Sequence, residues 1–254
     1  MPSIKKNREP GVFKTLSLPG RLRYIWDYYK LQMAASAIVL YIILFAAWRH
    51  FTAEDPFLYA GLVNVAVSGQ LEEKLTDGFI RSLPLNPSEN PVRLYKALYL
   101  TDNTDSQFYQ YTYASQMKIL AAIDDEQLDV VFLDKEAFDA FAQNGYLYDL
   151  DTFFHETALS GASSAQTEDT LCDLLSSSFV SNMEILEDNA KEVALDPSAS
   201  YQASTREYAM GLRLLDFPML RDAGFTDELF LCILANTPRK EAVIEYVRYL
   251  TDIR

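Results

Sequence analysis

The stretch Leu128–Gly145, LDVVFLDKEAFDAFAQNG, decides the fold class. Its first six residues form a short and almost continuous apolar run, which is typical of a parallel strand that is buried on both faces. Asp134 stops this run, and the apolar residues after it recur at helical spacing as far as Gly145, a natural helix C-cap. The stretch therefore predicts a buried strand followed by a covering helix.

Two further strand–helix units precede this one. Residues 57–67, FLYAGLVNVAV, are apolar and β-prone, and Ser68-Gly69 separates them from a helix-like run over 70–83. Residues 92–100, VRLYKALYL, predict a second strand, and a helix over 106–123 follows it. Helical spacing places five residues on one apolar face of that helix: Tyr109, Tyr113, Met117, Leu120 and Ile123.

The remainder of the chain predicts two helices, two strands and a last helix, over 168–176, 179–194, 210–215, 229–236 and from Pro238 onward. Alternating strands and helices favour parallel pairing with right-handed crossovers. The predicted fold class is therefore α/β, with one N-terminal transmembrane helix followed by an open, mainly parallel sheet that helices cover.

The transmembrane prediction rests on residues 31–48, LQMAASAIVLYIILFAAW, in which Gln32 is the only strongly polar residue. Eighteen helical residues extend about 27 Å, close to the roughly 30 Å of bilayer hydrocarbon. Residues 1–30 hold seven Lys/Arg against two acids, which predicts a cytoplasmic N-terminus. We expect a single-pass bacterial cell-membrane protein whose C-terminal domain is extracellular. A cleaved signal peptide and a buried helix of a soluble protein stay open as alternatives.

The predicted domain organisation follows from this segment. A basic cytoplasmic tail, a transmembrane helix, a linker and an extracytoplasmic α/β domain occupy residues 1–30, 31–48, 49–56 and 57–254. Within the last, we expect a first lobe, a reduced second lobe and a returning strand and helix, over 57–155, 156–227 and 228–254.

Charge and cysteine content exclude several classes. From Phe51 onward the chain holds 14 Lys/Arg against 34 Asp/Glu, so this part repels phosphate backbones and we expect no nucleic-acid partner. Cys172 and Cys232 are too far apart for a short metal-binding motif, and we expect no metal and no cofactor. Two buried thiols and a single disulfide both stay open for this pair.

Two segments resemble the extracytoplasmic solute-binding proteins of bacterial ABC importers. They are Lys118–Leu150, with a helix, "DVV", a strand-terminal Asp, a helix and "NGYLYDL", and Leu231–Leu250, LCILANTPRKEAVIEYVRYL. The family has two lobes, whereas the region between these two segments is too short for a full second lobe. The resemblance therefore implies a reduced, membrane-anchored relative, as found in Firmicutes. It implies the fold of that family first and its activity only second.

Ligands of open parallel sheets bind beyond the carboxyl ends of the strands. The loops expected there offer hydroxyl, amide and carboxylate groups, which suit a small polar or cationic solute; the residues are Ser68, Gly69, Asp102, Asn103, Asp134, Asn236 and Thr237. The same residue types are also ordinary helix caps and turns. The run FYQYTY at 108–113 either stacks on a sugar ring or packs in the core.

No catalytic residue is predicted. His50 and His155 form no pair that fits a metal or a proton relay, and no motif of a phosphate loop or nucleophile elbow occurs. A hydrolase that depends on carboxylates is the weakest hypothesis. We expect a membrane-tethered extracytoplasmic binding module that acts as a sensor or transport accessory. The alternative is a non-binding structural or interaction subunit of a membrane transporter or envelope complex.

Overall fold

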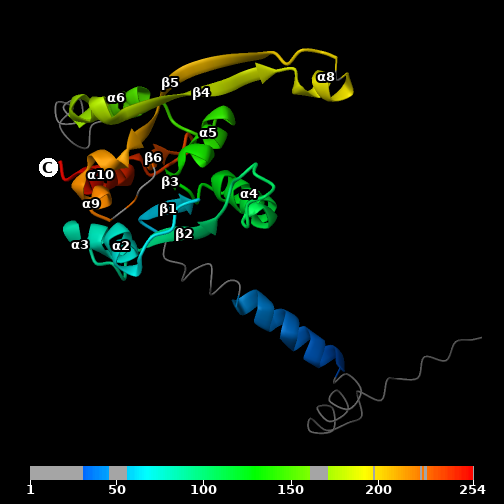
Figure 1. Ribbon diagram of the computed structural model, residues 1–254. Helices are drawn as coiled ribbons and strands as arrows, with labels where there is room; N and C mark the ends of the chain where they lie inside the picture. The colour runs from blue at the N-terminus through cyan, green and yellow to red at the C-terminus, as the bar shows by residue number, and fades with distance from the viewer. Residues whose placement is uncertain are drawn as a thin grey trace, which may run out of the picture. The chain divides into compact units, whose positions relative to one another are not determined.

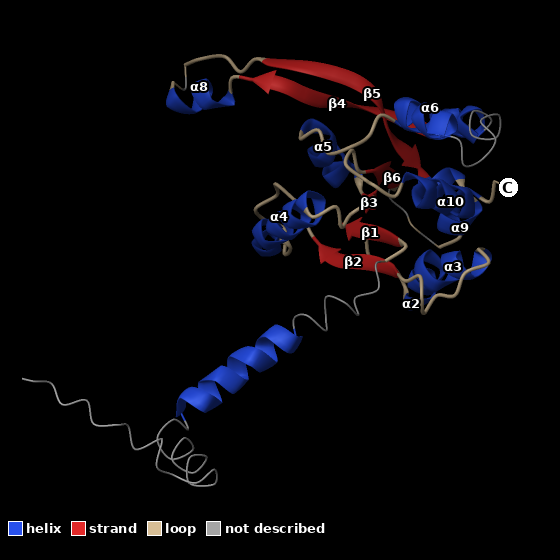
Figure 2. Ribbon diagram, turned by 180° about the vertical axis from the view of Figure 1, so that it is seen from behind, coloured by secondary structure: helices blue, strands red, loops and turns tan. Residues whose placement is uncertain are grey.

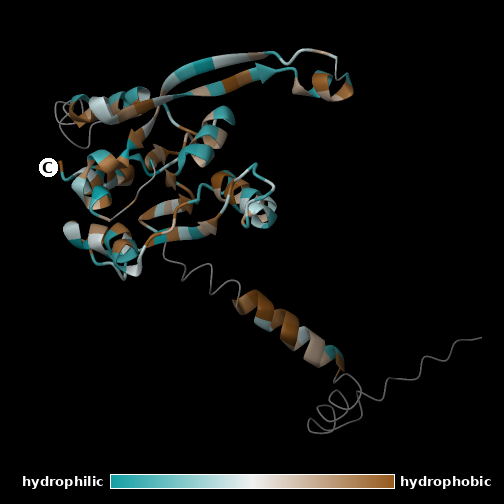
Figure 3. Cartoon of the chain, in the orientation of Figure 1, coloured by the Kyte–Doolittle hydropathy of each residue, from teal (hydrophilic) through white to brown (hydrophobic). Residues whose placement is uncertain are grey.

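The computed structural model describes residues 31–45, 56–160, 171–196, 198–223, 225 and 228–253. The chain forms two compact units, Met1–Ala53 and Glu54–Arg254. In the first unit, residues 31–45 form a helix whose side chains are all exposed and, from Met33 on, mainly apolar (Figure 3). No helix within the described ranges combines the length and hydropathy that a membrane crossing requires. Residues 46–48 of the predicted span, the tail 1–30 and the linker residues 49–55 lie outside the described residues.

The second unit is built on one open, mixed sheet of six strands in the order β2-β1-β3-β6-β5-β4 (Figure 1). β1 pairs in parallel with β2 and β3, whereas β6, β5 and β4 follow in antiparallel pairings. The strands are Leu58–Val63, Val92–Leu98, Val130–Leu133, Phe179–Asp188, Ala203–Arg213 and Phe230–Ile233, from β1 to β6. The prediction of an α/β fold with an open sheet is confirmed.

The prediction that this sheet is mainly parallel is wrong. Hydrophobic runs report that a strand is buried, but they carry no information on its direction. β4 and β5 are joined by residues 189–202 in a hairpin-like connection, which makes them antiparallel, and β6 returns beside β3 in the opposite sense. Residues 203–210 of β5 have β4 as their only partner strand among the described residues, so the two strands form a ribbon that carries α8 (Ala190–Leu195) near its end (Figure 1).

Helices cover both faces of the sheet (Figure 2). On one face lie α4 (Tyr109–Asp124) and α5 (Lys135–Gln143), whose buried side chains form one hydrophobic core. The other core contains side chains from the second set of helical elements: α2 (Gly69–Glu73), a π-helical turn (Lys74–Gly78), α3 (Phe79–Ser82), α6 (Leu150–Ser160), α9 (Pro218–Arg221) and α10 (Lys240–Thr251). Leu58, Ala60 and Leu62 of β1 enter this second core and Val63 the first, because side chains alternate along a strand.

The strand–helix unit at 128–145 is confirmed as β3 and α5. Asp134 is the N-cap of α5, and its Oδ1 accepts a hydrogen bond from the Ala137 amide at 2.8 Å. Gly145 follows the helix with φ +69°, and a Cβ there would lie 2.7 Å from Glu184 Oε1. Both the left-handed backbone and the close contact therefore favour glycine at this position.

Two helix predictions differ from the structure. The helix expected over 179–194 is wrong, because residues 179–188 form β4 and pair along β5. Their apolar residues fit neither a helical nor an alternating period well, so the long-range pairing decides. α4 exists, but its buried face consists of Ser115, Ile119 and Ala122. Tyr109 is 46% exposed and Tyr113 74% exposed, so the packing of these tyrosines in the core is wrong.

A local interaction explains the orientation of α4. Ser115 Oγ accepts a hydrogen bond from the Tyr99 amide at 2.9 Å, directly after β2. Small side chains at 115 and 122 let this face approach the sheet closely, which large tyrosine rings would prevent. The disulfide between Cys172 and Cys232 that the sequence left open is absent. Cys232 lies on β6 as a buried, free thiol, and burial raises its pKa.

Candidate functional site

The carboxyl ends of β1, β2 and β3 meet at one edge of the sheet, and Asn64 closes the point where they converge. Asn64 Oδ1 accepts from the Leu100 amide at 2.9 Å, and its Nδ2 donates to the Leu100 carbonyl at 2.6 Å. Nδ2 also donates to Asp134 Oδ1 at 3.1 Å. Asn64 has φ +59°, which asparagine tolerates better than most residues. One side chain thus joins the ends of three strands.

Two of the predicted site residues at this edge, Ser68 and Asp134, are each the N-cap of a different helix. Ser68 is the N-cap of α2, and its Oγ accepts from the Leu71 amide at 3.3 Å. Gly69 begins α2, with open space around the position of a Cβ. Asp134 caps α5 in the same manner. The local role of Ser68 and Asp134 is therefore helix capping.

The loop after β2 lies beside the N-terminus of α5. The Asp102 amide donates to Glu136 Oε1 at 2.9 Å. Asn103 Oδ1 accepts from the Asp105 amide at 3.0 Å, and its own amide donates to Thr101 Oγ1 at 3.2 Å. The Asn103 side chain shapes the loop, and the Asp102 carboxylate stays available.

Asn236 and Thr237 lie at the opposite edge of the sheet, because β6 runs antiparallel to β3. Asn236 Nδ2 donates to the Ile123 carbonyl at 2.6 Å. Thr237 Oγ1 donates to Oδ1 of the buried Asp129 at 2.7 Å, just before β3 begins. The four loops that the sequence groups together therefore form no single site.

A pocket of about 560 Å³ lies between α4 and α5, next to the end of β2. We call it the α4–α5 pocket. Its polar lining combines carboxylates, amides and hydroxyls: Thr101, Asp102, Thr112, Gln116, Glu136, Asp139, Gln143, Asn144 and Tyr146. Its volume falls in the range of small-molecule sites.

The charge of this pocket is negative. Asp139 Oδ1 is paired with Lys135 Nζ at 2.5 Å and accepts from Asn182 Nδ2 at 2.8 Å. Asp102 and Glu136 have no cationic partner within the described ranges, and the residues that line the pocket include no Lys, Arg or His. The pocket therefore favours cations and hydrogen-bond donors and disfavours anions.

One polar atom in the lining lacks a partner. Thr112 Oγ1 is enclosed and makes no hydrogen bond to any residue that the structure describes. Most enclosed polar atoms in proteins are paired, with protein groups or with ordered water. This hydroxyl adds a hydrogen-bonding group on the α4 side of the pocket, opposite the carboxylates of α5.

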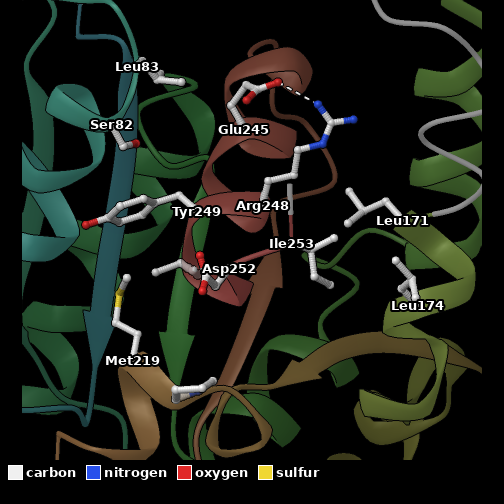
Figure 4. Close-up of a pocket in the computed structure, with 12 residues that line it drawn as sticks. Ser82, Leu83, Leu171, Leu174, Met219, Glu245, Arg248, Tyr249, Asp252 and Ile253 are labelled. Atoms are coloured by element: carbon white, nitrogen blue, oxygen red, sulfur yellow. Dashed lines mark hydrogen bonds and ion pairs between the residues drawn. The ribbon is translucent and has the colours of Figure 1, made fainter.

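A larger pocket, of about 780 Å³, surrounds the C-terminal end of α10 on the other face of the sheet (Figure 4). We call it the α10 pocket. Its lining is mainly apolar and comes from α3, residues 171–174, α9 and α10. None of the predicted site residues lines it.

Sequence reasoning missed Asn64 and Glu136. Asn64 is the single amide within the apolar run 57–67, and that isolated polar residue was the available signal. Glu136 is an ordinary first-turn acid of a helix until the loop after β2 is placed against it. Among the described residues, no group of His, Cys, Asp and Glu is arranged to hold a metal ion.

Comparison with protein-family models, with curated proteins and with solved structures found no match for this chain.

Proposed function

We propose that this chain is a membrane-tethered binding module, which holds a small polar solute, and a cationic one by preference, in the α4–α5 pocket. The observation that carries the proposal is the lining of that pocket, where Asp102 and Glu136 have no balancing cation among the residues that the structure describes. On this proposal the module serves as a sensor or as an accessory of a membrane transporter.

The two carboxylates come from different elements, which suits recognition of a compact cation. Asp102 belongs to the loop after β2, and Glu136 to the first turn of α5. The Asp102 amide holds Glu136 Oε1, so the second oxygen of Glu136 remains for a ligand. An ammonium group has three donors and can bond both carboxylates and one neutral acceptor together. Thr112 Oγ1 is enclosed in the wall of the pocket and can serve as this acceptor after its side chain rotates toward the ligand.

The tether is proposed for residues 31–48. In its support, the described part, 31–45, exposes large apolar side chains on all sides, such as Ile38 at 60% and Ile43 at 58%. A helix that is apolar all round is typical of burial in lipid or in a large core. The Lys/Arg excess of residues 1–30 supports a cytoplasmic N-terminus and an extracellular second unit. Kinship with solute-binding proteins is part of the same proposal.

Protease added to intact cells tests this topology. Removal of the second unit with protection of the N-terminal segment is the expected result. Protection of the second unit would contradict an extracellular location, and loss of the N-terminal segment from the membrane fraction would contradict the tether.

Calorimetric titration of the full chain in detergent tests the binding function. We expect putrescine to bind, glucose to bind more weakly, and glutamate to give no heat. Glu136→Gln keeps the acceptor for the Asp102 amide but removes the charge, and should weaken putrescine binding about tenfold, or about 1.4 kcal/mol. Glu187→Gln is the matched control, because Glu187 lies on the exposed ribbon of β4. Equal effects of the two variants would contradict the assignment of the pocket.

The alternative, an interaction subunit, is favoured by a different observation. α4 exposes Tyr109, Tyr113 and Met117, which recur every four residues along one side of the helix, and aromatic and Met side chains are enriched in protein interfaces. If no solute binds and Tyr113→Ser lowers the size of the particle in sedimentation, the interaction function replaces the binding function.

A further inference from the structure

The α10 pocket contains a cationic group that is only half paired. Arg248 lies on α10, and its side chain is 18% exposed. Its Nη1 donates to Glu245 Oε1 at 2.9 Å, one turn earlier on the same helix (Figure 4). Its Nη2 is enclosed and has no hydrogen-bond partner among the residues that the structure describes. Enclosed guanidinium donors are usually paired, so this atom can take an acceptor from a bound molecule.

The walls beside Arg248 are apolar. Leu171, Leu174 and Ile253 lie on the same side of α10 as the guanidinium group (Figure 4). Leu174 is 56% exposed. Leu171 is already buried, so a molecule that lies along it gains from removing the apolar surface of Leu174 and of the partly exposed Ile253 from water.

Neither acid that lines the pocket accepts a hydrogen bond from Nη2. Glu245 is already bonded to Nη1. Asp252 follows the end of α10 with a left-handed backbone, is exposed, and forms no ion pair within the described ranges. In Figure 4 its carboxylate lies between Tyr249 and Ile253, below the Arg248 guanidinium.

We propose that the α10 pocket binds a small aliphatic carboxylate, with the carboxylate on Arg248 Nη2 and the alkyl chain along Leu171, Leu174 and Ile253. The site is independent of the α4–α5 pocket, which lies on the other face of the sheet and has no Arg, Lys or His in its lining. A pocket of about 780 Å³ has room for a chain of this kind.

Binding includes a turn of the guanidinium group, because the surrounding protein encloses Nη2. The bond to Glu245 is the one side-chain hydrogen bond of Arg248 that the described residues provide, and Glu245 is 41% exposed. This pair is part-buried, and its single hydrogen bond fixes only one nitrogen of the planar guanidinium group. The guanidinium group can therefore turn toward a ligand while the helix stays in place.

A matched series of six-carbon probes tests the proposal: hexanoate, 1-hexanol and hexylammonium, titrated into the full chain in detergent and followed by the ring signals of Tyr249 and the methyl signal of Met219, which line the pocket. We expect hexanoate to bind about tenfold more tightly than hexanol, because hexanol shares its chain but lacks the charge. Hexylammonium should bind most weakly. Equal affinity of hexanoate and hexanol, tighter binding of hexylammonium, or no binding of any probe would each overturn the proposal.

Three variants assign the contacts. Arg248→Gln should remove the preference for hexanoate over hexanol, while Leu174→Asn should weaken the binding of both probes to the same extent. Arg221→Gln is the control, because Arg221 is an exposed arginine of the neighbouring α9 that does not line the pocket. Thermal unfolding without probe identifies a variant that fails to fold. If folded Arg248→Gln keeps the preference for hexanoate over hexanol, the role of Nη2 is overturned. If Arg221→Gln loses this preference as much as Arg248→Gln does, the placement of the site in the α10 pocket is overturned.

Discussion

Asn64 and Leu100 form a two-way pair in which one side chain replaces a strand partner. Asn64 Oδ1 accepts from the Leu100 amide at 2.9 Å, and Nδ2 donates to the Leu100 carbonyl at 2.6 Å. Both residues follow the last residues of parallel strands, where the ladder of backbone hydrogen bonds ends. The pair therefore extends the pairing of β1 and β2 and sets the position of the loop that carries Asp102.

The first prediction concerns this pair. Asn64→Ala removes the bonds to Leu100 and places an alanine at φ +59°, so the free energy of unfolding should fall by about 2–4 kcal/mol. Asn64→Gly loses the same bonds but tolerates the backbone, and should be less destabilising by about 1 kcal/mol. Urea unfolding of both variants measures the difference. If both variants lose the same free energy of unfolding, the backbone conformation at position 64 does not contribute to the difference in stability.

The second prediction concerns Asp129, which is fully buried just before β3. Oδ2 accepts from the Tyr59 amide at 2.8 Å, and Oδ1 accepts from Thr237 Oγ1 at 2.7 Å and from Arg239 Nη1 at 3.2 Å. Asp129→Asn turns an amide donor toward one of these donors and removes the charge that balances Arg239. Unfolding should become easier by about 2–4 kcal/mol.

The control for Asp129 is its exposed neighbour Asp125. Asp125→Asn should change the free energy of unfolding by no more than about 0.5 kcal/mol. A comparable loss in both variants would mean that net charge, and not the buried network, determines the effect.

The third prediction tests the orientation of α4. Ile119 is 3% exposed, whereas Tyr113 is 74% exposed. Ile119→Ala should lower the free energy of unfolding by about 2–4 kcal/mol, and Tyr113→Ala should change it by no more than about 0.5 kcal/mol. Chemical denaturation of the two variants measures these changes in the free energy of unfolding. The reverse order would support the helical face that the sequence predicts.

The fourth prediction concerns alkaline pH. Burial and the hydrogen bond from its hydroxyl to Glu184 Oε2, at 2.9 Å, raise the pKa of Tyr208 to about 12. Between about pH 10, the ordinary tyrosine pKa, and about pH 12, the folded state holds this proton and the unfolded state releases it. The contribution of Tyr208 to stability is therefore complete below about pH 10 and decreases as the pH rises to about 12.

Urea unfolding across this pH range, with wild type and Tyr208→Phe, measures that contribution. The variant should show a shallower loss of stability. Glu184→Gln removes the charge next to the hydroxyl and should move the steep part of the curve to lower pH. A Tyr208→Phe curve parallel to that of wild type would contradict the prediction.

The sequence by itself determined the strand–helix units. The apolar run before Asp134, the helical spacing after it and Gly145 are local signals, and β3, α5 and the turn between them follow these signals closely. The same holds for β6 and α10. A short apolar run with a cap and a stop predicts an element because its cause lies within the element.

Tertiary structure alone decided the relations between those units. The direction of β6 depends on its pairing with β3, the conversion of residues 179–188 into β4 depends on β5, and the rotation of α4 depends on Ser115 and Tyr99. Each of these pairings joins residues that lie apart in the chain, where the local pattern permits several partners. The antiparallel direction of β6 also places Asn236 and Thr237 at the opposite edge of the sheet from Asp102, so the predicted site residues do not come together. The pocket lies between α4 and α5 instead.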